Sequence, residues 1–485
     1  MRRGLAGLLA VPLLAGCLSS GGGGGGGVPA PTAKLPAGAR VAPASASAFV
    51  SLSTDLRSRQ GRRRLELYRR FAYTGNLFPT LSRGATRALG SELDLVFLDF
   101  KAGGNDVVGL VKPKSRVSFN GLLKPGGLGG PRTVTAEVGG WTIFADSRAL
   151  LDRFARDARS GKLADDKAFR DAMGRVDAHA AVRAYVSGKP VQRAVDRLLA
   201  SEGAPPMLSE EVGTLVSMAF GASAEPTASR VDGVVRVAGD VRPNAYTAEL
   251  PEEVPGGALV YVSFNHLDLV LKKVLKAVSE QNPTFEQQLS QLTAVMDITL
   301  SHDIYPLFSH EGGVGVYRGK PSPTIVLLLR LKDEARAKRL LGRSVTLAQI
   351  AGSGRLTTRS FAFNGTKVAE LDLFGGRTKI FAAVFSERLA LANSESMMRR
   401  LIEGDGTKLS DDRLFEHVTT EAKMPRRTLG FVYANLRDAT FQLPQRGRSF
   451  VVPAERTKTA PLRAALLYAT RDGDRYALTG FLAIK

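Results

Sequence analysis

Apolar and polar residues alternate in short runs along the chain, a pattern typical of β-strands, and some runs lead into apolar residues at helical spacing. The first run covers 48–52, and a similar one covers 260–264. After the second, leucine and valine recur every three or four residues over 267–278, which predicts an amphipathic helix. Further strands are predicted at 95–100, 107–111, 133–138, 314–317 and 325–329.

The predicted elements occur twice in the same order, which indicates an internal repeat. Turn residues Leu89-Gly90-Ser91-Glu92 precede a strand in the first copy, as Phe308-Ser309-His310-Glu311 do in the second. Later correspondences keep this order: 145–147 with 392–394, 163–169 with 409–415, 182–186 with 429–433, and 231–237 with 476–484. The copies diverge where 333–338 opens a charged helix, because the first copy has the glycine-rich segment Gly121–Gly130 there.

Strands in adjacent runs, interrupted by helices, favour an α+β fold with a mostly antiparallel sheet over a doubly wound parallel sheet. We therefore predict two homologous tandem repeats of this class, each a sheet with packed helices. The first covers residues 46–248 and the second residues 255–485, and the Pro- and Glu-rich segment 249–257 marks the joint between them.

These motifs resemble those of the domain-of-unknown-function 3352 family of exported bacterial proteins. The resemblance rests on Phe49-Val50-Ser51-Leu52, on Leu89-Gly90-Ser91-Glu92, and on the helix start with Leu163, Asp166 and Phe169. It covers most of residues 45–485 and is weaker in the first copy, which lacks the charged helix predicted from 333. The resemblance implies no activity, substrate or catalytic residue.

The N-terminus has the pattern of an export signal. Arg2 and Arg3 precede an apolar stretch over 5–14, which is too short to span a membrane. The following Leu14-Ala15-Gly16-Cys17 resembles the lipobox of bacterial lipoproteins, in which the cysteine thiol receives a diacylglyceryl group and the chain is cut before it. The alternative is an ordinary secretory signal with a chance cysteine. We expect removal of residues 1–16 and anchoring of Cys17 in the membrane, outside the cytoplasm.

Residues 17–45 are rich in Gly, Ser and Pro and are predicted to form a flexible tether between the lipid and the folded body. Cys17 is the only cysteine, which excludes an intramolecular disulfide and zinc sites built on cysteine pairs.

Composition is that of a globular protein, with 44% hydrophobic and 23% charged residues, but the formal net charge is +21. Such a charge favours anionic neighbours, such as lipid headgroups or wall polymers, although a GC-rich coding sequence also raises the arginine content. Nucleic acid is not expected, because export separates the protein from it and no recognition motif is present.

Basic residues crowd one short segment after the first strand, which also has an apolar side formed by Leu65, Leu67, Tyr68 and Phe71. We expect a helix here that contacts an anionic surface, against the alternative of an ordinary solvated helix face. The candidate contact residues are Arg57, Arg59, Arg62, Arg63, Arg64, Arg69 and Arg70.

Motifs for catalysis or cofactor binding are weak. His266, His302, His310 and His417 match no metal-ligand spacing, and a carboxylate at Glu92 or Glu311, in a turn before a strand, is usually solvated. Asp165-Asp166 and Asp411-Asp412 stand where helix caps are expected, so capping explains them better than acid–base chemistry. The segment 351–354 lacks the G-x-S-x-G pattern of a serine nucleophile, and the glycine run 21–27 lacks the lysine of a phosphate loop.

The sequence therefore predicts a non-enzymatic envelope protein that needs no cofactor or metal and acts as an interaction or structural module. The alternative is a binding protein for a small or lipidic ligand held in or between its two lobes.

Overall fold

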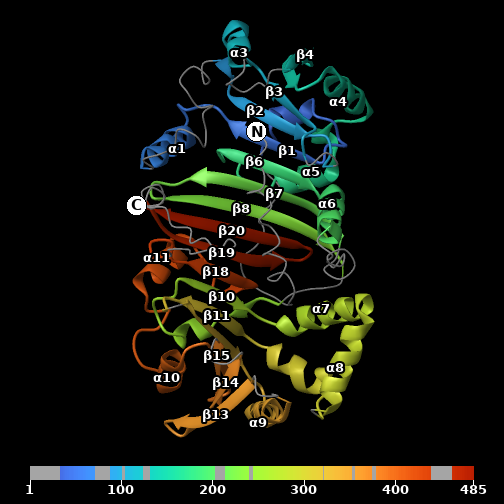
Figure 1. The fold of residues 1–485 in the computed structure, drawn as a ribbon. Helices are drawn as coiled ribbons and strands as arrows, with labels where there is room; N and C mark the ends of the chain where they lie inside the picture. The colour runs from blue at the N-terminus through green and yellow to red at the C-terminus, as the bar shows by residue number, and fades with distance from the viewer. Residues whose placement is uncertain are drawn as a thin grey trace. The chain divides into compact units, whose positions relative to one another are not determined.

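A computed structural model describes residues 33–70, 88–100, 104–123, 132–201, 214–239, 244–295, 297–320, 322–351, 356–373, 378–438 and 461–485. Of these, the residues within 26–240, 441–463 and 471–485 form one compact unit, the N-terminal unit, and those within 241–440 and 464–470 form another, the C-terminal unit. Both units are α+β, and their strand pairings are antiparallel, as the sequence predicts (Figure 1).

The N-terminal unit is a sheet in the order β4-β5-β3-β2-β1-β6-β7-β8-β20. Its strands are β1 (Ala48–Ser53), β2 (Glu92–Phe97), β3 (Val107–Val111), β4 (Val134–Val138), β5 (Trp141–Ala145), β6 (Val182–Ser187), β7 (Thr214–Ala224), β8 (Ala228–Ala238) and β20 (Arg475–Ile484). Its helices are η3 (Ala37–Arg40), α1 (Arg59–Arg70), α3 (Arg116–Leu122), α4 (Arg148–Ser160), η5 (Leu163–Asp165), α5 (Lys167–Met173) and α6 (Gly188–Ser201).

The C-terminal unit has a sheet in the order β13-β14-β15-β16-β12-β11-β10-β18-β19. These strands are β10 (Val260–Phe264), β11 (Gly312–Tyr317), β12 (Thr324–Arg330), β13 (Leu356–Phe363), β14 (Thr366–Leu373), β15 (Thr378–Phe385), β16 (Arg388–Ala392), β18 (Gly430–Ala434) and β19 (Leu462–Asp472). A separate short pair joins β9 (Tyr246–Thr247) to β17 (Arg427–Thr428).

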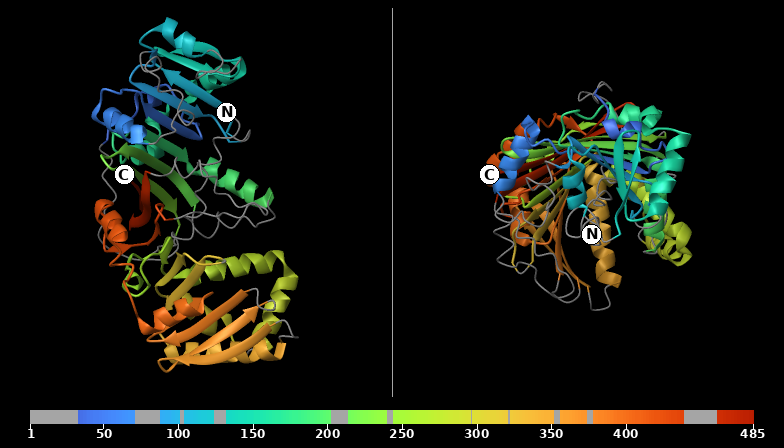
Figure 2. Two further views of the ribbon diagram at one scale, coloured as in Figure 1. Left: turned by 60° about the vertical axis from the view of Figure 1, so that its left-hand side comes forward. Right: turned by 90° about the horizontal axis from the view of Figure 1, so that it is seen from above.

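The helices of the C-terminal unit are η6 (Leu250–Glu252), α7 (Leu267–Gln281), α8 (Pro283–Val295), η7 (Leu300–Ile304), η8 (Tyr305–Phe308), α9 (Glu334–Ala351), α10 (Glu395–Glu403) and α11 (Arg413–Glu421). Figure 2 shows the strands and helices of each unit from two further directions.

Local sequence explains where several helices begin. Ser147 accepts a hydrogen bond from Leu150 N at the start of α4, and Ser394 accepts one from Met397 N at the start of α10. The predicted aspartate caps are confirmed: Asp166 accepts from Phe169 N at 2.7 Å, and Asp412 accepts from Leu414 N at 2.9 Å. These side chains satisfy N–H groups that have no partner within the helix.

Aromatic side chains fill corresponding places in the two cores. In the N-terminal unit Phe169 packs edge-on against Tyr185 at 4.9 Å between ring centroids, and Phe49 lies beside both. In the C-terminal unit Phe415 packs against Tyr433 at 5.1 Å, and Tyr261 is the strand partner of Tyr433.

The expectation of a tether over 17–45 is wrong for its last part, which is folded. Ala37–Arg40 form η3, and Ala39, Ala42 and Ala46 are buried in the core of the N-terminal unit. Leu163 N also donates to the carbonyl of Ala42 at 2.9 Å. Alanine-rich composition concealed this segment, because small side chains give no apolar periodicity yet fill a core well. Residues 17–32 lie outside the described part of the chain.

Two further expectations differ from the structure. The first copy was expected to have the glycine-rich segment Gly121–Gly130 where the second copy has its charged helix, but a short helix, α3, capped by Ser115, includes the first two residues of that segment. The second repeat was expected to run to residue 485, yet β20 pairs along its length with β8 and belongs to the N-terminal unit. The compact units are therefore not contiguous segments.

Candidate functional site

The basic helix α1 presents most of its arginines to solvent. Its buried face holds Leu67, which packs with Ala224 and Ile484. Arg64 is turned inward and donates to the carbonyl of Ser53 at 3.0 Å, and Arg63 is half-buried. The exposed arginines of this region, which we call the arginine face, are Arg57, Arg59, Arg62, Arg69 and Arg70.

Among the described residues, no acidic side chain forms an ion pair with the arginine face. The side chain of Arg62 donates to the backbone carbonyl of Arg57 at 2.6 Å. Arg153, elsewhere in this unit, does pair with acidic residues, Asp99 and Asp106. The arginine face therefore carries a local excess of positive charge, five arginines against the exposed carboxylates of Asp55 and Glu66.

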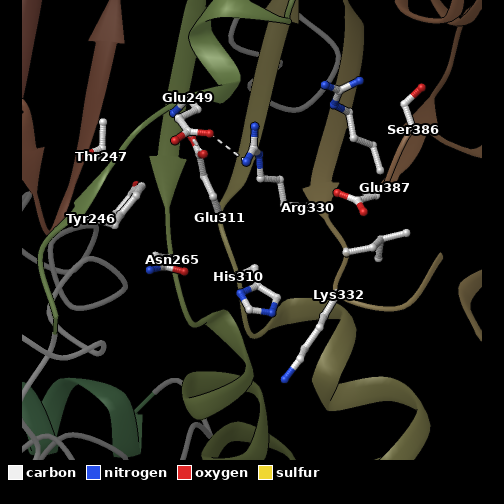
Figure 3. A pocket seen from close by; sticks show the side chains of 12 residues that line it. Tyr246, Thr247, Glu249, Asn265, His310, Glu311, Arg330, Lys332, Ser386 and Glu387 are labelled. Carbon is white, nitrogen blue, oxygen red and sulfur yellow. Dashed lines mark hydrogen bonds and ion pairs between the residues drawn. The ribbon is translucent and has the colours of Figure 1, made fainter.

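The C-terminal unit has a polar pocket of about 440 Å³ (Figure 3). It lies among β9, the end of β10, the start of β11, the end of β12 and the β15–β16 turn. The residues that line it are Tyr246, Thr247, Glu249, Asn265, His310, Glu311, Arg330, Leu331, Lys332, Ser386, Glu387 and Arg388.

Two arginines of this pocket are already neutralised by acidic residues. Arg330 pairs with Glu249 at 2.7 Å, the contact drawn in Figure 3, and with Glu253 at 3.1 Å. Arg388 also pairs with Glu253, at 2.7 Å through Nη2. Such partly buried, multiply bonded pairs hold the side chains in place and leave them little capacity for a further charged partner.

Glu311 is buried behind the pocket, with 7% of its surface exposed. Its carboxylate accepts backbone hydrogen bonds from Glu249 N at 3.0 Å and Leu250 N at 2.9 Å, at the start of η6. Burial raises its pKa to about 7, although these hydrogen bonds and nearby Arg330 act in the opposite direction. The expectation that Glu311 is solvated is therefore wrong.

The N-terminal unit uses Glu92 in the same way, since its Oε1 accepts from Ala37 N at 3.0 Å at the start of η3. Asp94, on the same strand, is fully buried beneath Gly38, where a Cβ would lie 1.8 Å from Asp94 Oδ2. Burial, and then the neighbouring Glu92, hold the pKa of Asp94 well above its ordinary value. Only glycine fits at position 38.

Three ionisable side chains of the pocket have no hydrogen-bond or ion-pair partner among the described residues: His310, Lys332 and Glu387. Burial, and then the nearby charges of His266 and Lys332, lower the pKa of His310. Glu387 stands with Ser386 in the turn between β15 and β16, and both have positive φ, at 58° and 45°. Sequence reasoning singled out only His310 and Glu311 here, because the other residues come from distant segments without a shared motif.

Comparison with known proteins gives a family for the chain. A family model described as "Protein of unknown function (DUF3352)" matches residues 124–466. The chain belongs to this family. No curated protein sequence matches it. Among solved structures, crystal form IV of TP0453 aligns with 14% identity over 49% of this chain and 94% of the other, with a TM-score of 0.24. Crystal form III of TP0453 aligns at 12% identity with a TM-score of 0.25, over 49% and 95% of the two chains.

The four histidines weighed as metal ligands in this DUF3352 protein do not all lie together. His310 lies near His266, but His302 bonds Ser301 at 3.0 Å and His417 is exposed on α11. No set of three or more His, Cys, Asp or Glu residues in the described ranges is arranged to hold a metal ion.

Some residues singled out in the sequence of the DUF3352 chain lie outside the residues that the structure describes. Cys17 and the leader 1–16 lie outside the described residues, as do 124–130 of the glycine-rich segment and Ser353. Where the helices are described, none is both long and apolar enough to cross a bilayer.

Proposed function

We propose that this protein is a lipid-anchored module of the cell envelope that acts by binding, and that the arginine face holds its body against anionic lipid headgroups. The observation that carries the proposal is the set of five exposed arginines on and before α1 that lack acidic partners among the described residues. The lipobox-like segment before Cys17 supplies the reason for a membrane location.

The two attachments support each other physically. A basic residue near an anionic membrane surface contributes about 1 kcal/mol, so five arginines supply up to about 5 kcal/mol at low salt. This attraction fades within a Debye length, about 8 Å at physiological ionic strength, so it acts only when the body is already close to the surface. A lipid on Cys17 keeps the body close, and the arginine face then orients it.

Vesicle binding tests the role of the arginine face. The chain beginning at Leu18, which lacks the lipid, is mixed at low salt with vesicles of neutral lipid, with or without a third of anionic lipid. We expect binding to anionic vesicles only, and at least a tenfold loss in the variant with Arg57, Arg59, Arg62, Arg69 and Arg70 replaced by Gln.

The matched control removes the same charge from another part of the N-terminal unit. It replaces with Gln five exposed basic residues that form no ion pair within the described part of the chain: Arg40, Arg156, Arg159, Lys167 and Arg170. If both variants lose binding equally, net charge and not the arginine face attracts the membrane, and the proposal fails.

The lipid anchor has its own test. Metabolic labelling with a fatty-acid probe should mark the wild-type chain and leave Cys17→Ser unmarked. Labelling of the Cys17→Ser chain would contradict the anchor while leaving the arginine face to be judged by vesicle binding.

We also propose that the two units descend from one duplicated α+β unit. Support comes from the shared pairing order, β4-β5-β3-β2-β1-β6-β7 in one unit and β15-β16-β12-β11-β10-β18-β19 in the other. The isolated bridges Pro43–Lys162 and Pro255–Lys408 occupy the same place in each unit. Glu92 and Glu311 make the same contact to the preceding 3₁₀ helix.

A further inference from the structure

The β15–β16 turn of the C-terminal unit adopts a backbone that its residues disfavour. Phe385 pairs with Arg388, so Ser386 and Glu387 form a two-residue hairpin turn with positive φ at both positions. Such turns favour Asn and Gly, because a side chain at positive φ crowds the backbone. Neither Ser nor Glu is favoured by the turn itself.

The corresponding turn of the N-terminal unit has the same backbone without this strain. There Val138 pairs with Trp141, and the two turn residues are Gly139 and Gly140, with φ of 55° and 74°. The C-terminal unit therefore keeps the same backbone and places a carboxylate on it at some cost in stability. Strain that persists next to a pocket is typical of binding sites.

Surrounding contacts hold Glu387 in this position. Its N–H donates to Glu334 Oε2 at 2.6 Å, and its carbonyl accepts from Leu331 N at 2.8 Å. Its own carboxylate has no ion-pair partner in the described ranges and lines the pocket. The main chain is thus fixed by both bonds, while the charged group is left available.

The side chains of the pocket available to an anionic group are Lys332, which is a cation, and His310, whose lowered pKa favours the neutral imidazole. In Figure 3 the side chain of Lys332 extends downward below His310 and away from Glu387, whereas Arg330 is engaged with Glu249. Lys332 lies close enough to His310 to affect its protonation. The pocket therefore offers one free anion, Glu387, and one free cation, Lys332, with the imidazole of His310 beside it, and a ligand with a single charge would satisfy only one of the two charges.

We propose that this pocket binds a small zwitterion, whose ammonium group pairs with Glu387 and whose carboxylate or phosphate group faces His310 and Lys332. A volume of about 440 Å³ suits a metabolite of amino-acid size. Two sources share this chemistry: a free amino acid and a phosphoethanolamine headgroup. The site lies in the C-terminal unit and is independent of the arginine face on α1.

Calorimetric titration tests the proposal on the full-length chain in a nonionic detergent. The probes are the standard L-amino acids and O-phosphoethanolamine. We expect at least one probe to bind, and its analogue without the ammonium group, or without the anionic group, to bind at least tenfold more weakly. Which probe binds distinguishes the amino acid from the headgroup.

Two variants of the same turn separate binding from folding. Glu387→Gly and Ser386→Gly each install the residue found in the N-terminal unit and relieve one strained position, so both should fold at least as well as the wild type. Only Glu387→Gly should lose affinity, by about tenfold or more. Lys332→Gln should weaken binding of the wild-type ligand but leave the affinity of its analogue without the anionic group unchanged.

Any one of three results would overturn the proposal. The first is that no probe binds the wild type. The second is that Glu387→Gly binds the probe as tightly as Ser386→Gly does, and the third is that a singly charged analogue binds as tightly as the zwitterion.

Discussion

Substitution of Glu311 tests how burial of a carboxyl affects the unfolding free energy, because this carboxyl is buried and remains titratable near neutral pH. Replacing it in Glu311→Gln removes the titration with little change in shape. Its pKa of about 7 in the folded protein compares with an ordinary value of 4.5. At 1.36 kcal/mol per pKa unit, this difference corresponds to about 3 kcal/mol of unfolding free energy.

The sign of the pH dependence of stability follows from whether the folded or the unfolded chain binds the proton more tightly. The folded protein holds the Glu311 proton more strongly than the unfolded chain, so this carboxyl's contribution is fully present below about pH 4.5. The contribution is lost as the pH rises through about 7. Wild type should therefore lose about 3 kcal/mol relative to Glu311→Gln between roughly pH 4.5 and pH 8. The amide also gives up one accepted backbone hydrogen bond, but this loss is the same at every pH.

Urea unfolding followed by circular dichroism, at about pH 5 and about pH 8, measures this difference. Other groups titrate equally in both proteins, so the change in their stability difference isolates Glu311. Glu395→Gln, at a half-exposed position on α10, serves as the control and should show a difference that does not vary with pH. If the stability difference between wild type and Glu311→Gln is the same at both pH values, the carboxyl is not desolvated as described.

Three further substitutions probe the fold. Tyr261→Phe should raise the unfolding free energy by about 1 kcal/mol, because no described group bonds the buried Tyr261 hydroxyl; Tyr317→Phe, which loses a 2.9 Å bond to the Pro255 carbonyl, should lower it. Arg475→Ala should cost about 1.5–3 kcal/mol in urea unfolding, because Arg475 ties β20 to Asp171 at 3.1 Å; a loss no larger than that of exposed Arg399→Ala would show that the pair is unimportant. Asp412→Ala should lower the unfolding free energy by about 0.5–2 kcal/mol, because it removes the cap of α11. Asp165→Ala, next to the capping residue of α5, is the control and should lower the unfolding free energy by less. Equal losses in the two variants would count against capping.

The features that sequence reasoning predicted well depend on neighbouring residues. Asp166 and Asp412 bond N–H groups two or three residues ahead, so their role is visible in a few letters of sequence. The helix predicted for the basic segment begins at Arg59, close to the first of the clustered arginines. β3 matches its predicted range, because an apolar run there is bounded by polar turns on both sides.

The missed features depend on contacts between distant segments. Glu311 is desolvated by the chain around Glu249 and Leu250, about sixty positions earlier, so a turn glutamate had to be read as solvated. Membership of β20 in the N-terminal unit rests on its pairing with β8, more than two hundred residues away. The Ser386–Glu387 turn carries no glycine, and so the usual hairpin signal was absent.

Corresponding positions of the two units differ in a way that bears on where function resides. The C-terminal unit has Ser386 and Glu387 in place of a glycine pair, and Tyr261 with an unbonded buried hydroxyl in place of Phe49. Each difference lowers stability without a compensating contact within the described chain. The N-terminal unit also has a destabilising residue, the buried carboxyl of Asp94, but Asp94 lies beneath η3 and lines no described pocket. Because strained backbone positions cluster at binding sites, substitutions in the polar pocket beside Glu387 should alter function before they alter folding.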